Sequence, residues 1–99
     1  MVAIIYIRVD NDFIQLSTKD DDLMIDSSSV ISIDRTSHSD KVMYTITTRS
    51  GLLITFTITN ATRGTLMIES DRKIYEYKSP KGSEDDYDFM DIRNWLESQ

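Results

Sequence analysis

The sequence predicts a mainly β fold of the α+β class: an antiparallel sheet, sandwich or small barrel of roughly six to eight short strands with one C-terminal α-helix. Apolar and polar residues alternate through much of residues 1–78, as in strands with one buried face. A Pro-Gly break at 79–83 then divides this β-rich body from a terminal segment, 84–99, in which apolar residues have helical spacing. We expect residues 1–99 to form a single domain, with 79–83 as a linker turn.

The first half of the β-rich body is expected to contain several short strands. Residues 2–9 are almost continuous in Ile and Val, which favours a central strand covered on both faces. Residues 10–12, Asp-Asn-Asp, indicate a turn because such side chains bond to their own backbone. Further strands are expected at 13–17, 23–25 and 30–34.

The second half contains the most regular alternation in the chain. Segments 42–48 and 52–59 each place apolar residues on one face and mostly threonine on the other, which predicts an antiparallel hairpin. Gly51, in the turn between them, is suited to a positive φ angle. A second hairpin is expected from strands 65–69 and 73–78 with a tight turn at 70–72.

Residues 84–99 are predicted to form an acidic amphipathic terminal helix. Phe89, Ile92 and Leu96 fall at i, i+3 and i+7, which places them on one stripe, and Met90 and Trp95 flank it. A helix of about three turns is marginal alone in water. Its apolar stripe is therefore expected to pack on the sheet, where the helix would act as a core plug, or on a partner, where it would act as a docking element.

Charge is segregated along the chain, whose formal net charge is −6. Residues 1–34 contain seven acids and two bases, residues 35–83 four acids and eight bases, and residues 84–99 six acids and one base. This order indicates that the acidic ends pack near the basic centre, or that the fold has two faces of opposite potential. A negative protein repels DNA, RNA and anionic membranes and favours a protein partner with a basic surface.

Residue types that support catalysis or metal binding are scarce. The chain has no cysteine and one histidine, His38, too few for a zinc site, and its neighbours Ser37, Ser39 and Asp40 are too close in sequence to form a triad. The acids at 10–12 and 20–22 do not match a calcium-binding EF-hand loop. With three glycines, no phosphate-binding loop pattern occurs. We therefore expect a non-enzymatic protein with no catalytic residue, metal or cofactor.

Direct nucleic-acid binding is a weaker hypothesis. Bases and aromatic residues are interleaved in the β-rich middle, and a sheet that displays both can stack single-stranded bases. However, the bases fall mainly in expected turns, and the acidic flanks oppose phosphate. The aromatic residues concerned are Tyr44, Phe56, Tyr75 and Tyr77.

The acidic segment favours a protein-binding function. Carboxylates with aromatic anchors are able to occupy a groove that normally holds phosphates, which would make this small acidic β-rich protein a DNA mimic and an inhibitor of a nuclease or related enzyme. By analogy of size and charge, phage antagonists of the anti-CRISPR or anti-restriction type and toxin-immunity proteins are such proteins. The candidate partner-binding residues are Glu84, Asp85, Asp86, Tyr87, Asp88 and Asp91.

An alternative function follows from the order of elements. Several short antiparallel strands followed by one helix is also the order of pleckstrin-homology-like scaffold or regulatory interaction modules. The absence of cysteine and of a long apolar run favours a cytoplasmic location away from membranes. Exposed strand edges in so threonine-rich a sheet favour a homodimer.

Overall fold

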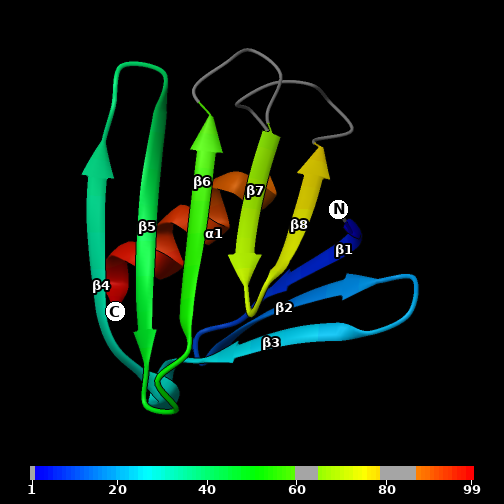
Figure 1. Ribbon diagram of the computed structural model, residues 1–99, viewed down its shortest axis with the longest axis horizontal. Helices are drawn as coiled ribbons and strands as arrows, with labels where there is room; N and C mark the ends of the chain where they lie inside the picture. The colour runs from blue at the N-terminus through cyan, green and yellow to red at the C-terminus, as the bar shows by residue number, and fades with distance from the viewer. Residues whose placement is uncertain (1, 60–64, 79–86) are drawn as a thin grey trace.

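The computed structural model describes residues 2–59, 65–78 and 87–99, and within them it has eight strands, one short 3₁₀ helix and one α-helix (Figure 1). The strands form one curled sheet, a half-barrel, and the helix lies along its inner face. In chain order the elements are β1 (Val2–Val9), β2 (Phe13–Thr18), β3 (Asp22–Asp26), η1 (Ser27–Ser29), β4 (Val30–Ser37), β5 (Lys41–Thr48), β6 (Leu53–Thr59), β7 (Thr65–Ser70), β8 (Lys73–Lys78) and α1 (Tyr87–Ser98).

The sheet consists of two antiparallel meanders joined side by side. The strand order is β3-β2-β1-β8-β7-β6-β5-β4, so the inner strands of the two meanders are β1 and β8. These two strands are parallel and pair through Val2 with Tyr75 and Ala3 with Glu76. The predicted β-rich fold with one C-terminal helix is confirmed, and this parallel pair is its one departure from an antiparallel sheet.

The connection between the meanders explains the curl. The edge strands β3 and β4 follow each other in sequence and are separated only by η1. Four residue steps, from Asp26 to Val30, span at most about 14 Å, whereas the outer strands of a flat eight-stranded sheet lie about 34 Å apart. The sheet therefore has to bend until the end of β3 meets the start of β4. Arg49 holds this junction, because its backbone N–H donates to the Ser29 carbonyl (2.8 Å) and its Nε to the Ser28 carbonyl (2.9 Å).

The two expected hairpin turns, at Gly51 and at residues 70–72, are present, with one feature that the sequence did not reveal. Gly51 has a φ of 86°, as its position predicts. In the two-residue turn between β7 and β8, Asp71 (φ 46°) and Arg72 (φ 66°) are both in the left-handed region, the geometry of a type I′ hairpin. Glycine usually occupies such positions, so Arg72 carries conformational strain.

The expectation that residues 2–9 are covered on both faces is wrong. β1 is central in the sheet, but the side chains of Ile5 and Tyr6 are 68% and 56% exposed. The pairing of β1 with β2 shifts register between Ile4 and Tyr6, so Ile5 and Tyr6 are both left on the outer surface. No described element covers that surface, since the helix lies on the opposite face.

The core lies between the inner face of the sheet and α1. Alternate residues of β5 and β6 are buried, as their period of two predicts, and Tyr44 and Phe56 are almost completely enclosed. From the helix, Ile92, Trp95 and Leu96 enter the same cluster, which confirms that this stripe faces inward. Met90 is exposed. The side chain of Phe89, the fourth residue predicted to face inward, lies outside the described part of the chain.

The helix begins at Tyr87 in the described chain, inside the predicted segment 84–99. The predicted linker turn, 79–83, and residues 84–86 lie outside the described residues. No helix that the structure describes has both the length and the apolar character needed to cross a membrane.

Candidate functional site

The candidate site is centred on Asp91, the predicted partner-binding residue whose side chain the structure describes. Asp91 is exposed on α1. Tyr87 and Asp88 lie in the first turn of the helix, although their side chains are not described, and Glu84, Asp85 and Asp86 precede the described helix. The structure therefore places one of the six predicted residues in full and leaves the clustering of the other five as a prediction.

Asp91 lines a cleft of about 440 Å³ between α1 and the turn that follows β1. The helix contributes residues at i, i+3, i+4 and i+7, which lie on one face. The end of β1 and its turn form the other wall. The lining residues are Val9, Asp10, Asn11, Asp91, Asn94, Trp95 and Ser98.

The β1–β2 turn fixes the second carboxylate of the cleft. The backbone N–H of Asp10 donates to the Phe13 carbonyl (2.9 Å), and the Asp10 Oδ1 accepts the backbone N–H of Asn11 (2.7 Å). These bonds confirm the predicted Asp-Asn-Asp turn and leave Oδ2 of Asp10 for other contacts. Arg8 Nη2 lies 3.8 Å from Oδ2, and its guanidinium is 5.4 Å from the centre of the Phe13 ring. Both side chains of the Arg8–Asp10 pair are about half exposed, so water screens the pair strongly.

Trp95 positions the helix wall of the cleft. Its side chain is buried in the core, and its carbonyl accepts bonds from the Ser98 Oγ (2.8 Å) and the Gln99 Nε2 (3.1 Å). These two bonds satisfy a backbone acceptor of the last helical turn. The Trp95 Nε1 is buried without a hydrogen-bond partner among the described residues. Because Trp95 is anchored, Asp91 and Asn94 are held toward the β1–β2 turn.

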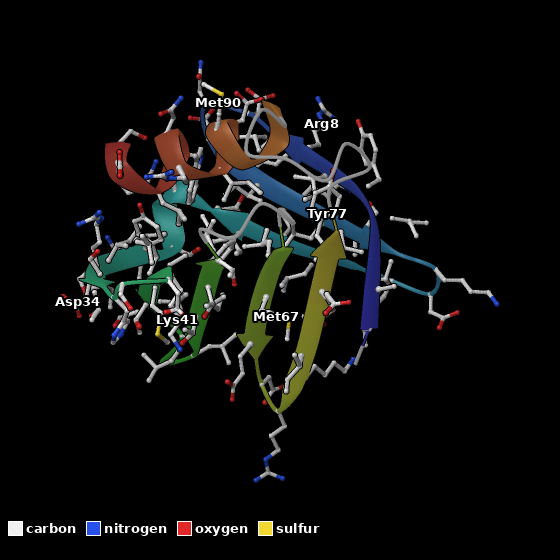
Figure 2. The ribbon with its side chains drawn as sticks, turned by 90° about the horizontal axis from the view of Figure 1, so that it is seen from above. Arg8, Asp34, Lys41, Met67, Tyr77 and Met90 are labelled. Carbon is white, nitrogen blue, oxygen red and sulfur yellow. The ribbon has the colours of Figure 1, made fainter. Side chains whose placement is uncertain are left out.

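The cleft brings together acids that are far apart in the sequence. Asp10 and Asp91 come from the acidic N-terminal and C-terminal segments, and they line the same hollow. Of the acids in the two end segments, Asp10 and Asp91 lie together at this cleft, and Asp21 lies beside Lys73 of the basic centre. In Figure 2, Arg8 and Met90 lie on the helix side of the molecule, away from Asp34 and Lys41 on the β4–β5 side.

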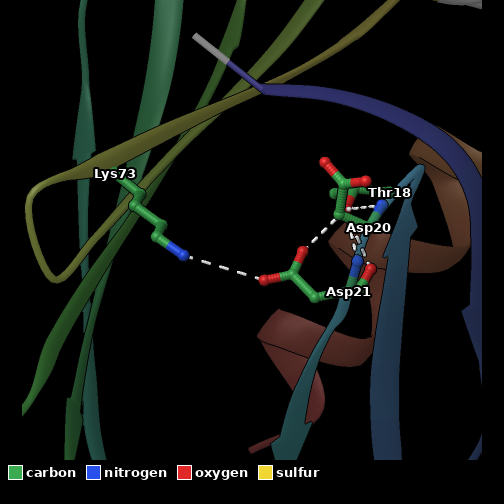
Figure 3. Close-up of polar contacts among 4 residues, drawn as sticks. All are labelled: Thr18, Asp20, Asp21 and Lys73. Atoms are coloured by element: carbon green, nitrogen blue, oxygen red, sulfur yellow. Dashed lines mark hydrogen bonds and ion pairs between the residues drawn. The ribbon is translucent and has the colours of Figure 1, made fainter.

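The acids at 20–22 have a structural role in the turn between β2 and β3 (Figure 3). The Thr18 hydroxyl donates to the Asp21 Oδ1 (2.6 Å) and accepts the backbone N–H groups of Asp20 (3.3 Å) and Asp21 (3.1 Å). The other Asp21 oxygen lies 3.7 Å from the Lys73 Nζ on β8. Within the described ranges, no three or more His, Asp or Glu side chains gather as a metal site would require.

The aromatic residues of the nucleic-acid hypothesis are not displayed. Tyr44, Phe56, Tyr75 and Tyr77 are all buried on the inner face of the sheet, so they offer no stacking platform. Tyr44 reaches the helix, where its hydroxyl donates to the Glu97 Oε1 (3.0 Å). His38 is exposed in the β4–β5 turn.

Sequence reasoning found Asp91 but missed Asp10 as its neighbour. Each lies in an acidic stretch, but no local pattern shows that a residue of the first turn lines the same cleft as the terminal helix. Comparisons with protein-family models, with curated proteins and with solved structures found no match to this chain.

Proposed function

We propose that this protein is a non-enzymatic protein-binding domain that uses the acidic cleft to bind the basic surface of a partner. The observation that carries the proposal is the convergence of Asp10 and Asp91, from opposite ends of the chain, on one cleft. Two carboxylates, two amide side chains and a serine line it, together with Val9 and Trp95. Carboxylates offer only acceptors, so a lysine or arginine side chain is the complementary group.

The sequence segments that contain the cleft residues are also rich in acids. Residues 2–29, which form β1 to η1, contain six acids and two bases. Residues 84–88, which lead into α1, add four more acids. A concentration of one charge sign accelerates encounter with an oppositely charged partner, in a manner that salt suppresses.

A nucleic-acid enzyme is the kind of partner that we propose. Its phosphate-binding groove presents lysine and arginine side chains, and a protein surface with spaced carboxylates competes with phosphates for them. The domain would then act as an inhibitor that occludes the groove, as a phage or mobile-element antagonist of a host nuclease or a toxin-immunity protein does.

The test uses three forms of the full chain as immobilised bait in a cell lysate, at low and at high salt. They are the wild type, the cleft variant Asp10→Asn with Asp91→Lys, and the control variant Asp40→Asn with Glu69→Lys. Both variants change the net charge by the same amount, and the asparagine introduced at position 10 keeps an acceptor for the Asn11 N–H. Asp40, in the turn between β4 and β5, and Glu69, on β7, are exposed acids outside the cleft.

We expect the wild type and the control variant to retain the same nucleic-acid enzyme at low salt, and the cleft variant to lose it. Added duplex DNA should compete with the wild-type bait, because both occupy one groove. If all three baits capture the same proteins, or if DNA does not compete, the proposal is wrong. Thermal unfolding of each bait establishes that the fold is intact, since exposed substitutions change stability by less than about 0.5 kcal/mol.

A further inference from the structure

The two outer strands of the sheet, β3 and β4, differ in length and in charge. β3 has five residues and carries Asp22 and Asp26, after the acids of the β2–β3 turn. β4 has eight residues and carries one acid, Asp34, and one base, Arg35. Short, like-charged edge strands resist the addition of another strand, whereas a long, charge-balanced one does not. β4 is therefore the edge at which another strand is able to pair.

The register of the β4–β5 hairpin shows which N–H and C=O groups of β4 are not bonded to β5. The backbone N–H of His38 donates to the Lys41 carbonyl (2.8 Å), which identifies their facing positions as a hydrogen-bonded pair. Bonded and non-bonded pairs alternate along an antiparallel ladder, and the register is regular from Ser32 to Ser37. Ile33, Arg35 and Ser37 therefore direct their N–H and C=O groups away from β5, toward the open edge.

The inner side of this edge is also incompletely packed. A cleft of about 370 Å³ lies between β4, β5 and the end of α1, and is lined by Ile33, Arg35, Tyr44, Leu96, Glu97 and Gln99. Ile33 is only partly buried beside it. Arg35 makes no ion pair within the described part of the chain. An added strand would place a side chain next to Ile33 and cover this surface.

We propose that the occupant of this edge is a second copy of the chain, whose β4 pairs antiparallel with the first about a two-fold axis through Ile33. The argument for a second copy is charge. Chains of net charge −6 repel one another, so self-association requires a neutral edge, and β4 carries no net charge while β3 is acidic. A two-fold contact also closes on itself as a dimer, whereas β3 of one copy on β4 of the next would give an open fibre.

The position of the two-fold axis follows from like-charge repulsion across the strands. An axis at Asp34 or at Arg35 would place that residue opposite its own copy, which is destabilising. An axis at Ile33 instead faces Ile33 with Ile33 and Asp34 with Ser32 in the regular part of β4, and Arg35 with Ile31 at the register shift between Val30 and Ser32, over residues 30–36. An axis at Thr36 would leave only residues 35–37 of each β4 paired, because β4 ends at Ser37.

The register is tested by single cysteines, since the native chain has none. In the proposed dimer the two Ile33 Cα atoms lie about 5.5 Å apart, within disulfide range, whereas the two Arg35 Cα atoms lie about 14 Å apart. On mild oxidation of the full chain, we expect I33C to give a disulfide-linked dimer on a non-reducing gel. The controls R35C and M24C, the latter on the opposite edge, should stay monomeric. Equal cross-linking of all three, or none of I33C, would overturn the proposal.

The pairing itself is tested by proline scanning of the two edges. Proline lacks the N–H donor, so Arg35→Pro removes an outward donor that β5 does not use, and Met24→Pro is the matched change on β3. The Thr18 N–H donates to the Asp21 carbonyl, which makes these facing positions a hydrogen-bonded pair. Bonded and non-bonded pairs alternate from there along the β2–β3 register, so the N–H of Met24 points away from β2, toward the open edge. By analytical ultracentrifugation, we expect the wild type to approach twice its 11.5 kDa mass as concentration rises.

Arg35→Pro should raise the dissociation constant of this dimer at least about tenfold, because one hydrogen bond is lost from each copy. Met24→Pro and the charge control Arg35→Gln should change the dissociation constant less than about threefold. Amide exchange of the wild type gives a measurement that needs no variant. Protection at Ile33 and Arg35 should rise with protein concentration, and protection at Ser37, beyond the paired residues, and at Met24 should not. A wild type that is monomeric at all concentrations, or a dimer unaffected by Arg35→Pro, would refute the β4 interface.

Discussion

The two meanders of the sheet are held together in different ways. β4 to β8 is a continuous antiparallel ladder, in which each neighbouring pair of strands shares five or more facing positions. β1 to β3 also form an antiparallel ladder. This smaller meander pairs with the larger one only through the parallel contact of β1 with β8, which has two facing positions. The remaining links are the bonds from Arg49 to the Ser28 and Ser29 carbonyls, the exposed Asp21–Lys73 ion pair, and the packing of α1, which lies beside β1 and buries residues in the shared core. Backbone ladders therefore define each meander, and the helix supplies the buried packing between them.

The same division applies to charge. The smaller meander, residues 2–29 with η1, has six acids and two bases, whereas residues 30–78 have five acids and seven bases. The acidic surface that we propose as a partner-binding site therefore belongs to the region that depends on the helix. A change in the helix core should affect partner binding even when it leaves the cleft residues in place.

Loss of helix packing should have the largest effect on stability and should loosen the smaller meander first. We expect Leu96→Ala to lower the free energy of unfolding by about 2–5 kcal/mol, since Leu96 is buried in the core and its truncation leaves a cavity. In amide exchange, β1 to β3 should lose protection before β5 to β7. Met90→Ala, at an exposed position of the same helix, should change stability by less than about 0.5 kcal/mol. Uniform loss of protection across all strands would contradict the division into two meanders.

Removal of the Thr18 hydroxyl, which lies inside the smaller meander, should lower the free energy of unfolding. Thr18→Val keeps the shape of the side chain but removes the oxygen that serves the β2–β3 turn, so the N–H groups of Asp20 and Asp21 lose an acceptor. We expect a loss of about 1–2 kcal/mol in chemical denaturation. The control Thr57→Val, on the outer face of β6, should be nearly neutral. Equal effects of the two variants would show that the turn bonds do not contribute.

Relief of strain in the β7–β8 turn should stabilise the larger meander. Glycine adopts a positive φ without the steric cost that Arg72 incurs, so Arg72→Gly is expected to raise stability by about 0.5–1 kcal/mol. The converse change, Gly51→Ala, should lower stability by about 1 kcal/mol. An added Cβ at Gly51 has no atom within 4 Å, so backbone conformation alone determines that effect. Thermal unfolding measures both variants.

The ion pair between the meanders should contribute least. Lys73 and Asp21 are both more than half exposed, and their Nζ and Oδ2 lie 3.7 Å apart. Lys73→Met is therefore expected to change the free energy of unfolding by no more than about 0.5 kcal/mol, with the difference vanishing at high salt. A salt-independent loss of several kcal/mol would mean that this contact, rather than the helix, joins the meanders.

Local patterns in the sequence determine much of this fold, and long-range pairing determines the rest. Alternation located β5 and β6 within one residue, and the spacing of Ile92 and Leu96 identified the inner stripe of the helix. The exposure of Ile5 and Tyr6 was not predictable, because hydrophobicity does not reveal which face of β1 a helix will cover. The positive φ of Arg72 has no sequence signature either, since a two-residue turn imposes it on whatever residue is present.

The candidate site was predictable only in part for the same reason. Asp91 belongs to an acidic stretch that composition alone makes conspicuous. Asp10 becomes part of the site only because α1 packs beside β1, a contact between residues about eighty positions apart. Likewise, the sequence indicated that a strand edge is exposed, but the strand order was needed to identify β4 as that edge.

The pairing of β1 with β8 also has a consequence for how the chain folds. Val2 is synthesised before its partner on β8, Tyr75, and the helix that covers β1 comes later still. During translation β1 to β3 therefore form an incomplete sheet, while each strand from β5 onward pairs with the strand just before it. Because contacts between distant residues slow folding, closure of β1 onto β8 is expected to be the late, rate-limiting step. A circular permutant that begins at β4 and places β1 after α1 would shift that step and should change the refolding rate more than the stability.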